Sequence, residues 1–140
     1  MKTLVINAQD TVLGRIASFA AKQAREGNKV IIINAEKAII TGSPKKTQQE
    51  FKQRRERGDV YKGPFYPKTA AGTLKRSIRG MLPYKKAMGR KAFELIKVYE
   101  GVPKEIKETP IILEKATAKK LKTPKKISLG EISKWLGSKK

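Results

Sequence analysis

The sequence predicts an α/β fold, and three segments near its beginning carry that prediction. Residues 3–6 form a short apolar run that ends at the polar Asn7, as expected of a strand. Apolar residues then recur at helical spacing from Val12 to Ala24, until Gly27 and Asn28 end the pattern. Residues 30–33 are four β-branched residues without alternation, which is typical of a strand covered on both faces in a parallel sheet. Strand, helix and strand in this order predict a right-handed βαβ unit.

Shorter signals place the next elements. We expect Asp10 to cap the first helix and residues 38–40 to form a third strand. Pro44 suits the first position of a helix, which should run to Arg57, and the glycines and prolines of residues 58–72 indicate a loop.

The second half of the chain predicts three further helices and a strand. Thr73 or a neighbour should cap a short helix through Arg79, and residues 84–93 read as helical after a break at residues 80–83. Residues 95–99 form a credible last strand. Ser128 and Glu131 have the spacing of a capping box for a final helix. That helix would carry three apolar residues on one face: Ile132, Trp135 and Leu136.

Charge divides a chain whose length of 140 residues fits a single domain, residues 1–140. Residues 43–93 hold fifteen Lys or Arg against three acids, a net +12 of the whole chain's +21. Residues 1–42 hold six basic and three acidic residues, and residues 94–140 hold twelve and six. We therefore distinguish a basic insert over residues 43–93 and a lysine-rich C-terminal extension over residues 104–140.

Composition excludes several kinds of chemistry. The chain has no cysteine and no histidine, which rules out disulfides, cysteine-rich zinc sites, thiol catalysis and a Ser-His-Asp arrangement. Acids are scarce and scattered, so we expect no catalytic residue, no metal ligand set, no cofactor and no small-molecule substrate. The first apolar run is too short for a signal peptide, and no stretch approaches the ~20 apolar residues that span a bilayer. We expect a soluble cytoplasmic protein without a membrane partner.

The excess charge predicts a nucleic-acid partner. Repulsion on this scale destabilises a compact state unless something neutralises it. A phosphate backbone does so, because each Lys or Arg that meets a phosphate releases a condensed counterion. A basic helix over residues 45–57 is also compatible with a solvated face, but its two acids, Glu50 and Glu56, are too few for a lattice of ion pairs.

Two further basic segments favour RNA. The loop over residues 59–68 interleaves three aromatics with lysines, and its rings can either stack on unpaired bases or fold back onto the core. Residues 75–91 hold seven cations and two internal glycines, and their arginines suit two-pronged phosphate contacts. In this segment we expect Met81, Leu82 and Met88 to pack inward.

Three other features are weaker. Arg15 follows Gly14 at a helix N-terminus, which can bind phosphate, but no nucleotide-binding motif is present. Residues 34–37 follow a strand, where α/β proteins place ligands, although a polar turn is the simpler interpretation. Trp135 can anchor the core or an interface with another protein. The candidate RNA-binding residues are Arg15, Lys45, Lys46, Lys52, Arg54, Arg55, Arg57, Tyr61, Lys62, Phe65, Tyr66, Lys68, Lys75, Arg76, Arg79, Gly80, Tyr84, Lys85, Lys86, Arg90 and Lys91.

Four motifs in order add a family resemblance. They cover residues 10–18, residues 34–42, the Arg-Gly-Met-Leu-Pro sequence of residues 79–83, and the Lys-Val-Tyr-Glu-Gly-Val-Pro sequence of residues 97–103. Together they closely resemble the universal large ribosomal subunit protein family thirteen, in the form of its archaeal and eukaryotic branch. The resemblance runs from about residue 3 to residue 103.

The resemblance implies both fold and function. It implies a three-layer α/β/α sandwich around a four-stranded, mainly parallel sheet. It also implies a structural role in the large ribosomal subunit, with binding to large-subunit rRNA early in assembly, neighbouring ribosomal proteins as partners and no catalysis. In such proteins the Gly-Met-Leu-Pro turn and its basic flanks lie against RNA, which maps here onto residues 79–91.

Two other function classes stay open from the residues alone. A phosphoryl or nucleotidyl transferase would need clustered carboxylates for a metal ion, whereas the acids of this sequence are scarce and scattered. A DNA-compacting or regulatory RNA-binding protein outside the ribosome would share the same charge. A membrane-surface role is disfavoured, because no predicted helix combines a strong apolar face with a basic one.

Overall fold

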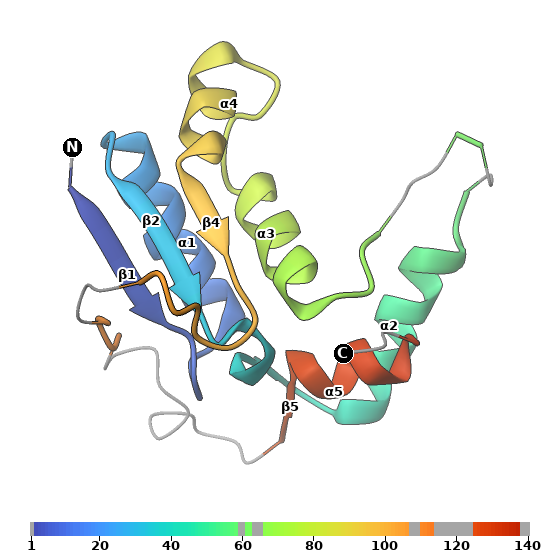
Figure 1. The fold of residues 1–140 in the computed structure, drawn as a ribbon. Helices are drawn as coiled ribbons and strands as arrows, with labels where there is room; N and C mark the ends of the chain where they lie inside the picture. Colours follow the sequence, from blue (N-terminus) through green and yellow to red (C-terminus); the bar gives the residue numbers. More distant parts are fainter. Residues whose placement is uncertain (1, 59–60, 63–65, 107–109, 114–124, 138–140) are drawn as a thin grey trace.

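The computed structural model describes residues 2–58, 61–62, 66–106, 110–113 and 125–137. Two small sheets and five α-helices make up this part of the chain (Figure 1). In chain order the elements are β1 (Thr3–Asn7), α1 (Leu13–Arg25), β2 (Lys29–Ile33), the 3₁₀ helix η1 (Ala35–Lys37), β3 (Ile39–Thr41), α2 (Pro44–Glu56), α3 (Ala70–Gly80), α4 (Ala87–Glu94), β4 (Ile96–Val98), β5 (Lys126–Ser128) and α5 (Leu129–Trp135).

The main sheet is parallel, in the order β1-β2-β4. Its central strand is β2, where Val30 lies opposite Leu4 on one side and Ile96 on the other. This position explains the unbroken β-branched run, since Val30, Ile32 and Ile33 are all buried. The predicted βαβ unit is confirmed.

The prediction of a three-layer α/β/α sandwich around a four-stranded sheet is not confirmed, because the main sheet has three strands. The expected third strand exists as β3, but it pairs antiparallel with β5 in a separate two-stranded sheet. On the outer edge of β1, Ile111 makes an isolated bridge instead: its amide donates to Val5 O at 2.7 Å, and its carbonyl accepts from Asn7 N at 3.0 Å.

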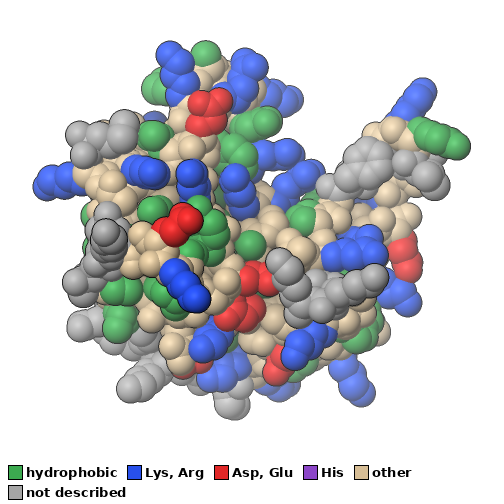
Figure 2. Space-filling model, in the orientation of Figure 1, with side chains coloured by type: hydrophobic (Ala, Val, Ile, Leu, Met, Phe, Trp, Pro, Cys, Tyr) green, Lys and Arg blue, Asp and Glu red, His purple; other side chains and the backbone are tan. Residues whose placement is uncertain are grey.

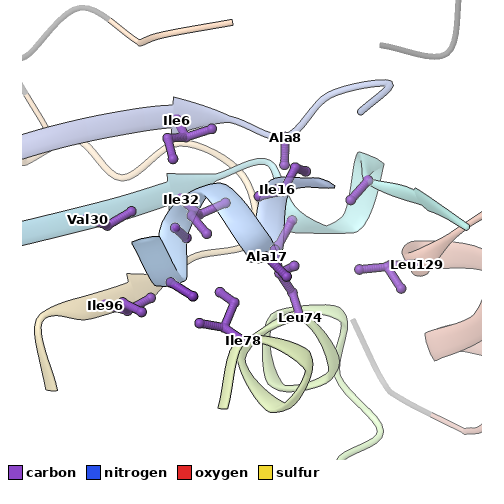
Figure 3. Close-up of a cluster of buried hydrophobic side chains, with 14 of the residues drawn as sticks. Ile6, Ala8, Ile16, Ala17, Val30, Ile32, Leu74, Ile78, Ile96 and Leu129 are labelled. Carbon is purple, nitrogen blue, oxygen red and sulfur yellow. The ribbon is translucent and has the colours of Figure 1, made fainter. Parts of the chain in front are cut away.

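One helical layer covers a face of the main sheet. The strand order advances in one direction, so right-handed crossovers bring α1 and α3 to the same face, where they pack on each other. Small residues on α1 allow this close approach, among them Ala17 and Ala20, which are fully buried. Figure 3 shows Ile32 and Ile96 of the sheet facing Leu74 and Ile78 of α3.

Two helix starts differ from the prediction. Val12 rather than Asp10 precedes α1, and Asp10 takes a left-handed φ of 53° in the preceding turn. The reason is tertiary, because Val12 bridges to Ile39 and the chain cannot turn helical earlier. Likewise Thr69 caps α3 by accepting from Gly72 N at 3.1 Å, while Thr73 lies buried inside the helix.

Two other helix starts are confirmed, and a third helix, α4, begins later than expected. Pro44 occupies the first turn of α2. Ser128 caps α5 by accepting from Glu131 N at 3.2 Å, which is half of a capping box. In the segment predicted helical over residues 84–93, α4 starts only at Ala87, because Lys86 N donates to Pro83 O at 2.9 Å in a turn.

A carboxylate from outside α3 also satisfies its N-terminus. Glu100 Oε1 accepts from Ala70 N at 3.0 Å and from Ala71 N at 3.5 Å. We expect Glu100→Ala to lower the free energy of unfolding by about 1–2 kcal/mol, since it removes a charge-assisted helix cap. Urea denaturation followed by circular dichroism measures this, with Glu94→Ala on the exposed side of α4 as the control. Equal stabilities of the two variants would contradict the capping role.

Candidate nucleic-acid interface

Three consecutive parts of the chain form a basic surface, which we call the α2–α4 surface: helix α2, the loop that follows it, and helices α3 and α4. Figure 2 shows Lys and Arg side chains over α4, along the adjoining side of α3, and over α2 and its loop. Most of the predicted cations on it are exposed: Lys45, Lys46, Lys52, Arg54, Arg57, Lys62, Lys68, Lys85, Lys86, Arg90 and Lys91. Arg55, Lys75, Arg76 and Arg79 are partly buried.

Helix α2 attaches by a narrow side and presents the rest of its circumference to solvent. Thr47 is its buried residue, and Phe51 packs partly buried against the core. The Arg54 guanidinium stacks over the Phe51 ring at 5.5 Å, and Arg55 Nη1 donates to Leu136 O at 3.4 Å. Lys52 and Glu56 form an ion pair at 3.9 Å with both side chains more than half exposed, so it stabilises little. A helix held in this way offers its cations to an external polyanion.

The aromatic residues of the loop divide between the two roles left open by the sequence. Tyr61 is 88% exposed, which suits a stacking partner for a base. Tyr66 is partly buried, and the Arg76 guanidinium lies 4.7 Å from its ring centre, which ties the loop to α3. Phe65 lies outside the described residues.

A row of two edge-to-face rings with a cation at each end joins α3 to α4. Lys75 Nζ lies 5.0 Å from the Phe93 ring centre, Phe93 meets Tyr84 edge to face at 5.6 Å, and Arg79 lies 5.0 Å over Tyr84. The negative faces of the rings attract both cations and restrict their side chains. This arrangement restricts two positive groups near the surface, and side chains restricted in this way lose less entropy on binding an anion than freely rotating ones do.

The turn between α3 and α4 is packed differently from expectation. Leu82 is buried as predicted, but Met81 and Met88 are 46% and 64% exposed, so the prediction that they pack inward is wrong. The turn is closed instead by Gly89, where a Cβ would overlap the carbonyl of Pro83. At Gly80 an added Cβ would meet no described atom within 4 Å, so packing within the protein does not require a glycine there. The exposed methionines line a hollow with Lys22 and Arg25 of α1.

The carboxyl end of the main sheet is filled by the chain itself. Asn34 N donates to Gly101 O at 3.0 Å, and Ala35 N donates to Tyr99 O at 3.2 Å. Glu36 Oε2 in turn accepts from Gly101 N at 2.9 Å. Residues 34–37 therefore form a polar turn, the simpler of the two interpretations. Glu36 and Glu100 both satisfy backbone amides, and in the described part of the chain no group of three acidic side chains could hold a metal ion.

Two predicted residues lie on other elements. Arg15 is exposed in the first turn of α1. Trp135 is 44% exposed at the end of α5, whose other apolar residues Leu129 and Ile132 are buried. The tryptophan is therefore not part of the core. In the described ranges, no helix is long and apolar enough to cross a membrane.

Comparison with known proteins decides the family. The family model described as "Ribosomal protein L13" matches residues 1–105. The large ribosomal subunit protein uL13 of Methanosarcina barkeri is 50% identical over 137 residues, which cover 96% of this chain and 98% of that protein. The chain belongs to the ribosomal protein L13 family. The uL13 proteins of Natronomonas pharaonis and Haloarcula marismortui are 44% and 42% identical and cover 96% and 98% of this chain, and 91% and 92% of their own lengths.

These relatives are archaeal, in agreement with the branch that the motifs indicate. The L13 family model ends at residue 105, whereas the archaeal similarity covers 96–98% of the chain. The C-terminal extension, which supplies β5 and α5, is therefore shared with archaeal members.

Sequence reasoning missed two residues that organise this L13 surface. Phe51 and Phe93 each hold a cation, yet neither was a candidate. A signal existed for Phe51, because Phe51 and Arg54 are three residues apart on a helix and therefore neighbours. No local pattern links Phe93 to Lys75, since their contact depends on the packing of α4 against α3.

Proposed function

We propose that this protein is a structural constituent of the large ribosomal subunit in the cytoplasm, that it binds large-subunit rRNA, and that it supports subunit assembly and translation without a catalytic role. Residues 43–93 act in this proposal as the RNA-binding insert of a single domain. The observation that carries it is the α2–α4 surface, where exposed cations far outnumber acids in a chain of the L13 family.

The proposed mechanism is charge neutralisation by a rigid scaffold. Phosphates from separate RNA segments repel one another, and cations placed between them allow close packing while counterions are released. The α/β core fixes α2 and α3, and the row from Lys75 to Arg79 fixes cations between helices. Such a surface reads the shape of folded RNA more than its sequence. Tyr61 adds an exposed ring that can stack on an unpaired base.

We also propose a protein partner for α5, near the C-terminus. Trp135 exposes a large ring at the end of a helix whose inner face is anchored by Leu129 and Ile132. Tryptophan is enriched among residues that dominate binding energy at protein interfaces. We assign this ring to contact with a neighbouring ribosomal protein.

Salt dependence tests the RNA proposal. The affinity of the full chain for large-subunit rRNA, measured by filter binding between 50 and 200 mM salt, is expected to fall with a slope of roughly −4 or steeper in log K against log salt. A slope near zero would reject the proposal. Co-sedimentation with large subunits after a high-salt wash separates a ribosomal constituent from an RNA- or DNA-binding protein that acts elsewhere, which would wash off.

A further inference from the structure

A hollow of about 220 Å³ lies between α2 and α3. Pockets that hold drug-sized ligands measure roughly 300–1,000 Å³, so this one suits a smaller group. Thr47 and Phe51 of α2 form part of one wall, and Thr73 and Ser77 of α3 form part of another. Tyr66 and Pro67 line it from the loop.

Positive charge surrounds this hollow. Arg54, Arg55 and Arg76 line it, against one acid, Glu50. Two of the three guanidinium groups stack on aromatic rings that also line it, Arg54 on Phe51 and Arg76 on Tyr66. A planar group attached to an anion therefore meets both the apolar walls and the charge that it requires.

Three hydroxyl groups of the hollow have a defined polarity. Thr47 Oγ1 donates to Ser43 O at 3.0 Å, Thr73 Oγ1 to Thr69 O at 2.9 Å, and Ser77 Oγ to Thr73 O at 3.2 Å. A hydroxyl has one hydrogen to donate, so each of these oxygens retains only its capacity to accept. Together with the Glu50 carboxylate, they give the hollow several acceptors beside its three guanidinium donors, and these acceptors match donors on the ligand.

We propose that this hollow receives one unstacked, amino-bearing base of the rRNA, that is adenine, cytosine or guanine, while the arginines contact the adjacent phosphate. The assignment rests on the proposed function and adds a nucleotide-sized site to it. Unpaired bases are the parts of RNA that proteins read by stacking and edge contacts. Uracil lacks an exocyclic amino group and offers these acceptors only its ring N3–H, so it satisfies fewer of them.

Mononucleotides test the site on the full chain. We expect the tightest of AMP, CMP and GMP to bind at least about five-fold more tightly than UMP or ribose 5-phosphate in an NMR titration, which corresponds to roughly one net hydrogen bond. Equal affinity for UMP and the other three nucleotides would overturn the base assignment. Equal affinity for ribose 5-phosphate and all four nucleotides would reduce the hollow to a patch of charge and overturn the proposal as well.

Two variants test whether the nucleotides bind in the hollow. Ser77→Leu fills it without removing a cation, and Ser18→Leu makes the same change at an exposed position of α1. We expect Ser77→Leu to bind AMP, CMP and GMP no better than ribose 5-phosphate, and Ser18→Leu to keep the preference. If Ser77→Leu fails to fold, Thr73→Val, which keeps the shape but removes a hydroxyl, is expected to weaken the preference over UMP. Unchanged preference in every folded hollow variant would overturn the proposal.

The salt slope separates this proposal from the function on which it rests. Ser77→Leu keeps every cation, so its rRNA salt slope should equal that of the natural chain. A natural chain with a steep slope and no base preference would refute the hollow alone. A natural chain whose slope is near zero would refute the RNA-binding function itself.

Discussion

Replacing Gly89 with alanine is expected to lower the free energy of unfolding by about 2–3 kcal/mol, because the added methyl group meets backbone rather than a movable side chain. Gly89 is buried in the first turn of α4, where a Cβ would overlap the Pro83 carbonyl and approach Tyr84 N to 2.9 Å. Backbone atoms cannot rotate away, so the turn over residues 81–86 would have to shift. Urea denaturation followed by far-ultraviolet circular dichroism measures the loss.

Gly80→Ala is the matched control for this substitution. Gly80 ends α3 nine residues earlier in the same segment, yet an added Cβ there meets no described atom within 4 Å. We expect its stability to change by less than about 1 kcal/mol, and a small gain is consistent with the lower entropy of the unfolded alanine chain. Equal losses in the two variants would show that the close contact with Pro83 does not determine stability.

Neutralising four exposed cations of the α2–α4 surface is expected to produce the largest effect on RNA binding. The variant carries Gln in place of Lys85, Lys86, Arg90 and Lys91, all of which are exposed. Each cation that contacts a phosphate contributes roughly 0.7–0.9 to the salt slope, so the slope should become shallower by about three units. Filter binding of large-subunit rRNA over a range of salt concentrations measures both slope and affinity.

The control removes the same charge elsewhere. Lys97, Lys104, Lys125 and Lys126 are also exposed but lie on β4, in the segment after it, and at β5. Their replacement by Gln should leave the slope within about one unit of the natural value. If both variants lose the same slope, binding depends on total charge rather than on the α2–α4 surface.

The first half of the fold could be predicted because its signals are local. The β-branched run of β2, the spacing of Ile16 and Ala20 on α1, and Pro44 at the start of α2 each depend on neighbours within one element. The place of β3 could not be predicted in this way. Its partner, β5, is distant in sequence, and three residues such as Ile39–Thr41 carry no information about which strand they will meet.

The predictions of two helix starts failed for a related reason. Asp10 and Thr73 have the chemistry of caps, but a bridge from Val12 to Ile39 and the carboxylate of Glu100 at Ala70 fix where α1 and α3 begin. Both determinants are contacts between elements. A cap residue can be recognised in a sequence, but which of two candidates is used depends on the fold.

The sequence indicated which basic residues would be exposed on the candidate surface, but not how its rings and its turn would pack. Lys and Arg are almost never fully buried unless they are paired, so the basic residues of this segment were expected at the surface. Most of them are exposed. The roles of Phe93 and Tyr84 depend on how α4 packs on α3. The exposure of Met81 and Met88 was missed because their apolar character suggests burial, whereas Leu82 and Gly89 already complete the turn.

The pairing of β3 with β5 has a consequence for how the molecule matures during translation. A nascent chain emerges from its N-terminus, so β3 is available long before Ile127 has been polymerised. Until then Ile39 and Ile40 lack the strand beside them, and η1 lacks the helix that packs on it. The basic helices therefore emerge from the ribosome ahead of the segment that completes their support.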